Sequence, residues 1–511
     1  MKLEVLNNHA YGTMGRCTRT RLSARITRAA WESHLGRLGA KLRSCTLALL
    51  LLLAACIPGS QSKGQDQPRA DSETTAEASC TIFARDKTIC ARNGRTGKVD
   101  FEGEDARAVI NNALAALDPA RTWKETVVLK GSLEIDLAPA SWDPNRRSGI
   151  EIPNYTTLRI QGKIRLRNNA SSTPGQVNYI VTNKDHKTGK QIDIQGGEID
   201  GNGQNNAHGI YGVQVSGVSD VRVVGMYIHD CRETGVAFEN VSRDCWAINN
   251  HVVGRRDLGL FWQDGLGNQN DCSDISYLGN LAEQCHFWGI YIEGGRHITA
   301  LGNTCRRNGK DGILVGEESQ TGNTMTIAAN SVYDNNLHGI FASAPKVRKI
   351  AILGNQVKNN AIAGSPHSGI VVRAQDVEVQ GNLCWDDQRT KTQQYGVALL
   401  TRANRCRVLD NNLTGNKLGG VLVQGGVMDC LLKNNAGHVT ESSGIATGHS
   451  PITVAHGLDP SIDPTRIRIT LGVRGDKPLR TSWRINPRDK AKIDIFHDGE
   501  GPADIAWSAQ E

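Results

Sequence analysis

Three acidic residues, Glu239, Asp264 and Glu293, have the side-chain type and the spacing to act as a general acid and base. Each follows the glycine of a short apolar segment by four or five residues, so stacking of these segments would place the acids on one face. Glu239 and Glu293 would then lie two windings, about 10 Å, apart, close to the roughly 6.5–9.5 Å between the carboxyl groups of an inverting glycosidase, and Asp264 would lie nearer. Crowded carboxylates raise one another's pKa, which keeps one of them protonated. The three acids therefore predict hydrolysis of a glycosidic bond.

Aromatic residues recur two positions after the same glycines. Four of the nine residues at this position are aromatic, although aromatic residues make up only 5% of the chain: Tyr211, Phe261, Tyr291 and Phe341. Rings in a row on an exposed sheet are a surface on which sugar units stack, so these residues are the predicted substrate-binding residues. The alternative is a surface covered by a loop, a tail or a sister subunit.

A lyase or an epimerase would need different residues. Such an enzyme takes a proton beside a uronate carboxylate with a base and neutralises that carboxylate with cations or calcium. Arg373 is the first candidate for that positive charge and for substrate binding. Further candidates are Lys310, Arg255 and Arg256 for charge, His208, His286 and His338 for the base, and Asp386-Asp387 for calcium. No C-x-x-C pair indicates a metal, so the sequence predicts no cofactor, with calcium as the alternative for a lyase.

Two columns of residues recur at intervals of 23 to 30 residues and predict the elements that would position these side chains. The first consists of glycines that open G-(I/V/L)-x-(apolar) segments: Gly209, Gly235, Gly259, Gly289, Gly312, Gly339, Gly369, Gly396, Gly420 and Gly444. The second consists of asparagines whose amides would stack: Asn250, Asn280, Asn303, Asn330, Asn355, Asn382, Asn411 and Asn434. One register over such a length is the signature of a parallel β-helix. Its cysteines would either form a column of small buried side chains, or Cys406 and Cys430, stacked on consecutive windings, would form a disulfide bond.

The N-terminal 56 residues read as an export leader. They hold nine of the 59 Lys and Arg residues and two of the 52 Asp and Glu residues, so the remaining chain is neutral and predicts no nucleic-acid partner. The apolar run 46–55 is too short to span a bilayer. It ends at Cys56 in a pattern that resembles a bacterial lipobox, which implies lipidation of Cys56 and a cell-envelope or extracellular location with an outer-membrane anchor. Residues 57–79 are polar and predict a flexible linker.

Residues 80–450 resemble the pectate lyase and polygalacturonase superfamily of right-handed parallel β-helices. The resemblance rests on a helix expected around residues 105–117, the segment IPNYTTLRIQG and the turn GGEIDGNG. It implies an all-β solenoid capped by the N-terminal helix. Residues 451–511 resemble the small C-terminal β-sandwich of phage tail proteins, whose role could be capping, trimer assembly or glycan binding. The Gly-His-Gly and Arg-Ile-Lys motifs of polygalacturonases and the Asp-Pro-His-Glu motif of alginate epimerases are missing, but tailspike-like depolymerases cleave glycans without the polygalacturonase motifs.

The sequence therefore predicts an exported protein that binds and cleaves an extracellular polysaccharide, with hydrolysis favoured over β-elimination. The alternative is a non-catalytic surface β-helix, an adhesin or a spacer, in which the rings bind glycan and the acids only confer solubility. Convergence of the three acids around one groove would favour the enzyme, and scatter would favour the binder.

Overall fold

The computed structural model describes residues 78–255, 264–316, 322–343, 346–364, 366–459, 462–474 and 478–510. The expected leader with Cys56 and nearly all of the expected linker therefore lie outside the described residues. Within the described ranges, no helix has the length and apolar character needed to cross a membrane.

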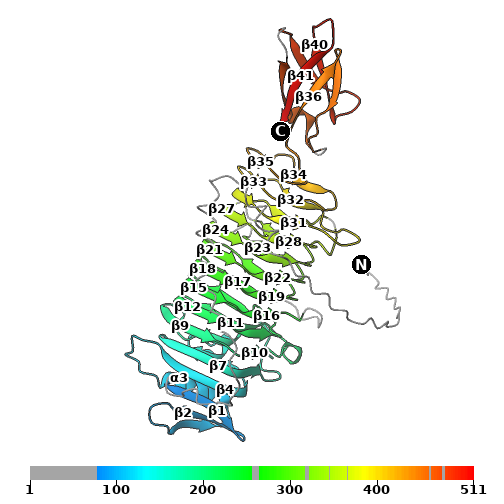
Figure 1. The fold of residues 1–511 in the computed structure, drawn as a ribbon. Coiled ribbons are helices and arrows are strands. Elements are labelled where there is room, and N and C mark those ends of the chain that lie inside the picture. The colour runs from blue at the N-terminus through cyan, green and yellow to red at the C-terminus, as the bar shows by residue number, and fades with distance from the viewer. Residues whose placement is uncertain are drawn as a thin grey trace, which may run out of the picture. The chain divides into compact units, whose positions relative to one another are not determined.

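The first elements close one end of the hydrophobic core. An antiparallel hairpin of β1 (Cys80–Arg85) and β2 (Thr88–Asn93), extended by β3 (Val99–Gly103), precedes the helix α3 (Ala106–Ala115). Asp105 begins the helix because its side chain accepts a hydrogen bond from the N–H of Arg107. The buried face of the helix, which includes Ile110 and Leu114, joins the core of the following strands. The expected N-terminal helix is present (Figure 1).

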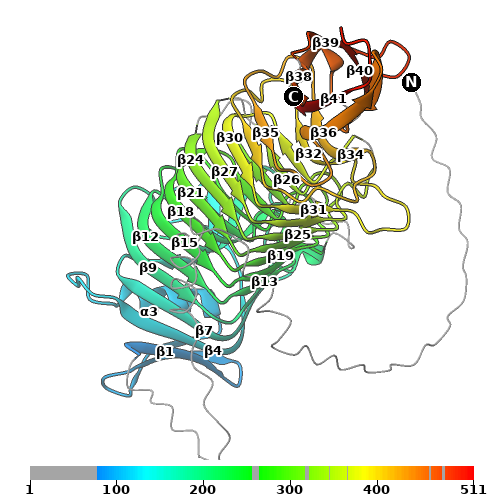
Figure 2. The same ribbon diagram turned by 45° about the horizontal axis from the view of Figure 1, so that its top comes forward.

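The chain then winds into a right-handed parallel β-helix with three strand columns (Figures 1 and 2). Sheet B is one column: β5 (Ala138–Pro139), β6 (Arg146–Ile152), β8 (Val177–Asn183), β11 (Ile210–Ser216), β14 (Val236–Glu239), β17 (Leu266–Asn268), β20 (Ile290–Ile292), β23 (Ile313–Val315), β26 (Ile340–Ala342), β29 (Ile370–Val372), β32 (Tyr395–Leu399) and β34 (Gly419–Val423). Sheet A contains the other two.

The first column of sheet A follows sheet B in each winding: β4 (Glu125–Ile135), β7 (Thr156–Leu166), β9 (Gly189–Gln195), β12 (Val218–Val224), β15 (Arg243–Ile248), β18 (Ser273–Leu278), β21 (Gly295–Leu301), β24 (Gly322–Ala328), β27 (Val347–Leu353), β30 (Gln375–Gln380), β33 (Arg407–Leu409) and β35 (Leu431–Lys433). The second column consists of β10 (Glu198–Asp200), β13 (Tyr227–His229), β16 (His251–Val253), β19 (Leu281–Glu283), β22 (Thr304–Arg306), β25 (Ser331–Tyr333), β28 (Gln356–Lys358) and β31 (Leu383–Trp385). One continuous hydrophobic core fills the space between the columns.

The glycine column exists, but its register differs from the prediction at three positions. Val213 pairs with Val236 and Leu266 pairs with Ile290, so Gly212 and Gly265 occupy the column in place of Gly209 and Gly259. Gly259 lies outside the described residues. Gly444 lies in an antiparallel strand further along the chain. The sequence pattern cannot choose between glycines a few residues apart, because each of them precedes an apolar residue.

Close approach of backbones explains why the column requires glycine. A Cβ atom on each member would lie only 2.4–3.0 Å from the carbonyl oxygen of the glycine in the next winding. The members are Gly212, Gly235, Gly265, Gly289, Gly312, Gly339, Gly369, Gly396 and Gly420, whose own neighbour is Gly437.

We expect Gly312→Ala to destabilise the β-helix by roughly 2–4 kcal/mol, because the added Cβ would lie 2.2 Å from Val332 Cγ1 and 2.8 Å from Gly339 O. Gly425→Ala is the matched control, since nothing lies within 4 Å of its Cβ. Urea denaturation followed by circular dichroism measures both variants. Equal midpoints for the two variants would contradict a steric role for the column.

The predicted asparagine ladder is present and spans eight windings. Each side-chain Nδ2 donates a hydrogen bond of 2.9–3.0 Å to the Oδ1 of the next member, and all members are buried. Its last member is Asn435 and not the predicted Asn434, because Asn434 adopts the left-handed conformation of the preceding turn and exposes its side chain. A second ladder, which the sequence did not reveal, runs through Asn308, Asn335, Asn360, Gln393 and Asn416.

The cysteines of the described residues are unbonded, and nearly all of them are buried in the core. Cys406 and Cys430 lie on adjacent windings, where the N–H of Cys406 donates to Cys430 Sγ at 3.4 Å. The alternative of a column of small buried side chains therefore describes them.

Antiparallel strands begin at Glu441 and form a separate hydrophobic core. One three-stranded sheet contains β36 (Glu441–Gly448), β41 (Ala503–Gln510) and β38 (Arg468–Arg474), and the other contains β37 (Ile452–Ala455), β40 (Lys492–His497) and β39 (Thr481–Ile485). Side chains of both sheets, among them Ile452, Ile495 and Ile505, pack together. This arrangement agrees with the expected C-terminal β-sandwich.

Candidate functional site

The outward surface of sheet B carries two columns of side chains that bear on chemistry. The residue immediately before each column glycine lies at the corner where the winding enters sheet B, and its backbone carbonyl accepts from the glycine N–H of the preceding winding, as Asp264 does from Gly235. The residue four positions after the glycine lies at the end of the strand: Glu239 is the last residue of β14, and Glu293 directly follows β20. We call these the corner column and the end column, and together they form the sheet B face.

Glu239 is held in one orientation by neighbours on the sheet B face. It is 8% exposed, and its Oε2 accepts a hydrogen bond of 2.9 Å from Gln214 Nε2. Gln214 is oriented in turn by the hydroxyl of Thr182, which donates to Gln214 Oε1 at 3.1 Å. Burial raises the pKa of Glu239, while hydrogen bonds from Gln214 and Tyr211 and the charge of Arg146 oppose this effect. The carboxyl group therefore occupies a position built to hold it.

Tyr211 packs beside Glu239 and next to a second, unpredicted tyrosine. The rings of Tyr211 and Tyr179 lie 5.5 Å apart, and Arg146 donates a hydrogen bond to Tyr179 Oη. Burial is the main reason that the pKa of Tyr179 rises to about 12, and it also raises the pKa of Tyr211. Both hydroxyl groups stay protonated near neutral pH and can donate hydrogen bonds.

Glu233 is an acid of the same region that the sequence interpretation missed. It lies in the turn between β13 and β14, where its N–H donates to Ile210 O at 2.9 Å and its half-buried carboxyl group lies against Gly209. Burial, with smaller contributions from the negative charges of Asp264 and Glu239, raises its pKa to about 7. Glu233 can therefore hold a proton at neutral pH while lying close enough to both acids to feel their charge.

Asp264 occupies the corner column, directly before Gly265. Its Oδ1 accepts a long hydrogen bond of 3.4 Å from the N–H of Trp288, the corner residue of the next winding. Asp311 is the following corner residue, and it accepts from Trp288 Nε1 at 3.1 Å and from the N–H of His338 at 2.8 Å. Burial raises the pKa of Asp311 to about 6.

The predicted column of rings is present in part. Tyr291, Leu314 and Phe341 stack in adjacent windings as predicted, whereas Tyr211 pairs with Tyr179 because the register of its winding begins at Gly212. Tyr291 is only 6% exposed and stacks on Trp288 with a centroid distance of 4.7 Å. The half-buried Phe341 packs edge-on against His338. Phe261 lies outside the described residues.

Trp288 adds an unpredicted ring to the corner column of the central windings. It is half-buried, and Lys310 Nζ lies 4.2 Å above it and 3.8 Å from the centroid of Phe287. The signal that could have found Trp288 is its position immediately before Gly289, in the sequence His-Phe-Trp-Gly.

Glu293 and Arg373 lie in the end column, in separate windings. Glu293 lies two windings after Glu239, as predicted. Arg373 lies three windings after Glu293, and its N–H donates to Ala342 O of the preceding winding. The structure thus groups Glu239 and Asp264 with Tyr211 and Glu233, places Glu293 further along the face and leaves Arg373 well outside the group.

The residues proposed for calcium, and His338 among those proposed as a lyase base, have structural contacts. Asp386 accepts hydrogen bonds from the N–H groups of Gln388, Thr392 and Gln393, and Asp387 accepts from Asn359 Nδ2. His338 Nδ1 accepts from the N–H of Ser368, and burial lowers its pKa to about 3. Asp386 thus organises its own turn, and the half-buried His338 stays neutral.

One cluster of the described residues, on sheet A, has the composition of a metal site. Ligand atoms of Glu198, Asp200 and His229 lie within 4.8 Å of one another. Lys163 Nζ, however, lies 2.8 Å from Glu198 and 2.7 Å from Asp200, and these contacts contribute to lowering the pKa of both carboxyl groups. The ammonium group already supplies the positive charge that a metal would bring, so the cluster is an ion-pair network.

Comparisons with known proteins agree with this architecture. A family model described as a right handed beta helix region matches residues 283–436, and no curated protein matches the chain. The A-module of mannuronan C-5 epimerase AlgE4 from Azotobacter vinelandii is similar, with 15% identity and a TM-score of 0.51, over 63% of this chain and 95% of that module. A tailspike mutant of E. coli bacteriophage HK620 in complex with a pentasaccharide is also similar, with 10% identity and a TM-score of 0.54, over 80% of this chain and 90% of the tailspike chain. These likenesses concern the fold.

Proposed function

From the right-handed β-helix and the acids on its sheet B face, we propose that the protein binds a polysaccharide on this face and hydrolyses it. The observation that carries the proposal is Glu233, a half-buried carboxyl group with a pKa of about 7 beside two further acids. A carboxyl group that keeps its proton beside further carboxyl groups is an arrangement suited to acid-base cleavage of a glycosidic bond. The similar tailspike, which was solved with a pentasaccharide, supports a glycan ligand for this fold.

In this proposal Glu233 acts as the general acid and Asp264 as the general base. Glu233 donates its proton to the glycosidic oxygen while the bond from that oxygen to the anomeric carbon breaks. A water molecule attacks the anomeric carbon and passes its proton to Asp264. Glu239, fixed by Gln214, and the hydroxyl group of Tyr211 orient the sugar. Glu293 extends the acidic face toward the next sugar unit.

Hydrolysis is favoured over β-elimination by the charge around Glu233. β-Elimination requires positive charge beside the uronate carboxylate, whereas the charges that act on Glu233 are those of Asp264 and Glu239. Arg146 acts on Glu239 and Lys310 lies above Trp288, and neither is among the groups that shift the pKa of Glu233. Arg373, the predicted cation, lies several windings away.

The protein's activity on a panel of neutral and acidic polysaccharides tests the proposal. Reducing ends without absorbance of unsaturated products would support hydrolysis. Both signals together would indicate a lyase and would contradict the roles assigned to Glu233 and Asp264. Neither signal, in the presence of measurable binding, would favour the second candidate, a glycan-binding adhesin, in which Glu239 and its bond from Gln214 serve only to hold the surface in shape.

Trp288→Ala should weaken oligosaccharide binding by roughly threefold to tenfold, because this half-buried ring is the stacking surface next to Asp264. Isothermal titration with the best ligand of the panel measures the effect. Trp123→Ala is the matched control, since Trp123 is 60% exposed and lies beside the N-terminal hairpin and helix α3. An equal loss in both variants would place the glycan elsewhere.

A further inference from the structure

A second feature of the β-helix lies at the edge of sheet A where each winding leaves sheet B. The backbone pairings place eight residues directly above one another: Lys190, Ser219, Arg243, Ser273, Arg296, Asn323, Arg348 and Gln375. Basic and neutral polar residues alternate in this column without exception. We call it the alternating column.

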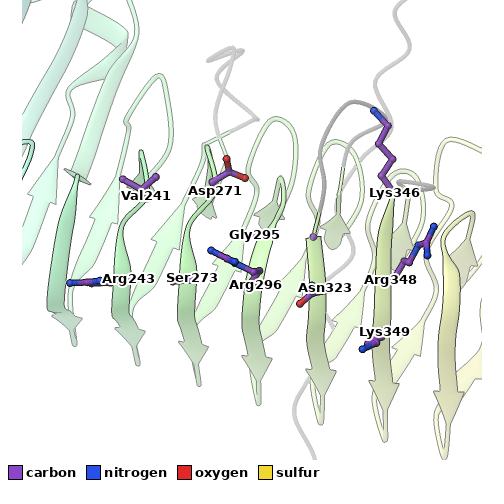
Figure 3. Close-up of a pocket in the computed structure, with 11 residues that line it drawn as sticks. Val241, Arg243, Asp271, Ser273, Gly295, Arg296, Asn323, Lys346, Arg348 and Lys349 are labelled. Carbon is purple, nitrogen blue, oxygen red and sulfur yellow. The ribbon is translucent and has the colours of Figure 1, made fainter.

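Part of the alternating column lines a groove. The groove has a volume of about 740 Å³, and Figure 3 shows Arg243, Arg296 and Arg348 on alternate strands with Ser273 and Asn323 between them. Lys346 and Lys349 add positive charge, and Asp271 is the acid among the residues that line it. The three arginines are exposed, and none of them forms an ion pair with any of the described residues.

The distance between basic side chains in the column sets the distance between negative charges on a ligand that would match it. Adjacent windings are about 4.8 Å apart, so the basic side chains recur about every 10 Å and a hydroxyl or amide group lies midway between them. A linear polymer aligned with the column would meet a cation at every second unit. Two sugar units of an extended polysaccharide have this length.

We propose that the alternating column binds a linear polysaccharide in which an acidic sugar alternates with a neutral one. Arg243, Arg296 and Arg348 pair with the carboxylate of every second sugar, and Ser273 and Asn323 hydrogen-bond to the hydroxyl groups of the sugars between. This binding does not depend on cleavage at the sheet B face.

The chemistry of the groove favours a glycan over a nucleic acid. The side chains that line it include no aromatic ring on which bases would stack. A nucleic acid carries a charge at every unit, so its charges would also face the neutral members of the column. The charge is local, because the chain after residue 56 has equal numbers of acidic and basic residues.

Hyaluronan, which alternates glucuronate with N-acetylglucosamine, is the test ligand, and carboxyl-reduced hyaluronan is its neutral counterpart. We expect Arg296→Gln/Arg348→Gln to weaken hyaluronan binding by at least about tenfold and to make the affinity less dependent on salt concentration. The control Arg402→Gln/Lys417→Gln removes two exposed charges outside the column and should change neither quantity. All variants keep their fold, since the side chains are exposed, and circular dichroism verifies this.

Three results would overturn the proposal: equal binding of the carboxyl-reduced polymer, unchanged binding by the column variant, or tighter binding of an oligodeoxythymidylate of matched length. Hyaluronan binding by Glu233→Gln separates this proposal from the previous one. If Glu233→Gln still binds hyaluronan and Arg296→Gln/Arg348→Gln does not, the alternating column is the binding site, whether or not the sheet B face is catalytic.

Discussion

Glu233→Gln should reduce the rate of polysaccharide cleavage by roughly 10²–10⁴-fold with little change in glycan affinity. The amide keeps the size of the side chain but has no proton to give to the leaving oxygen. Initial rates from reducing-end assays, together with binding measured by titration, give the two quantities separately. Glu134→Gln, which changes an exposed acid on sheet A, is the control and should retain full activity.

The pH dependence follows from the pKa of Glu233. Since the acid must be protonated and its pKa is about 7, cleavage should decline above about pH 7, and Glu233→Gln should abolish this decline. The folded state binds this proton more strongly than the unfolded state does, so stability falls as pH rises from the ordinary value of 4.5 through 7. Glu233→Gln should therefore raise the free energy of unfolding at pH 8 by about 1–3 kcal/mol relative to the wild type, and by little at pH 4. Full activity of this variant would eliminate Glu233 as the acid.

Asn330→Ala should destabilise the β-helix by roughly 3–5 kcal/mol, the largest effect expected from one side chain. Its Oδ1 accepts from both the N–H and the Nδ2 of Asn303, and its Nδ2 donates to Ala300 O and Asn355 Oδ1. All four partners are buried inside the solenoid, where water cannot replace the lost bonds.

Asn336→Ala provides the comparison for this prediction, because Asn336 lies six residues away but outside both ladders. Thermal and urea unfolding of the two variants measure the difference. A decrease of less than about 1 kcal/mol in the free energy of unfolding of Asn330→Ala would mean that the ladder does not stabilise the fold.

The period of the fold could be predicted from the sequence, but its register could not be predicted everywhere. Gly235 and Gly289 were placed correctly because each stands alone before its apolar residue. Gly209 lies three residues from Gly212 and Gly259 six from Gly265, and a pattern of single residues cannot separate such pairs. Which glycine of a pair belongs to the column depends on which one lies against the carbonyl oxygen of the next winding, and this contact between windings is not visible in the sequence.

The candidate site shows the same limit. Glu239 could be found because it ends a strand at a fixed distance from its glycine. Glu233 lies in a turn, and turns differ in length from one winding to the next, so its approach to Asp264 follows from the folded path. The position of Tyr291 in the column could be predicted, but its burial could not, because the ring of Trp288 from the preceding corner stacks on it.

Because basic and neutral residues alternate in the alternating column, the number of windings matters to its pattern. Removing one winding from its middle would leave a stackable chain, yet it would set two arginines, or two neutral residues, side by side and put the two halves of the column out of phase. Growth or shrinkage by pairs of windings preserves the phase. Under the proposed binding of a disaccharide repeat, the solenoid can therefore gain or lose windings only in pairs.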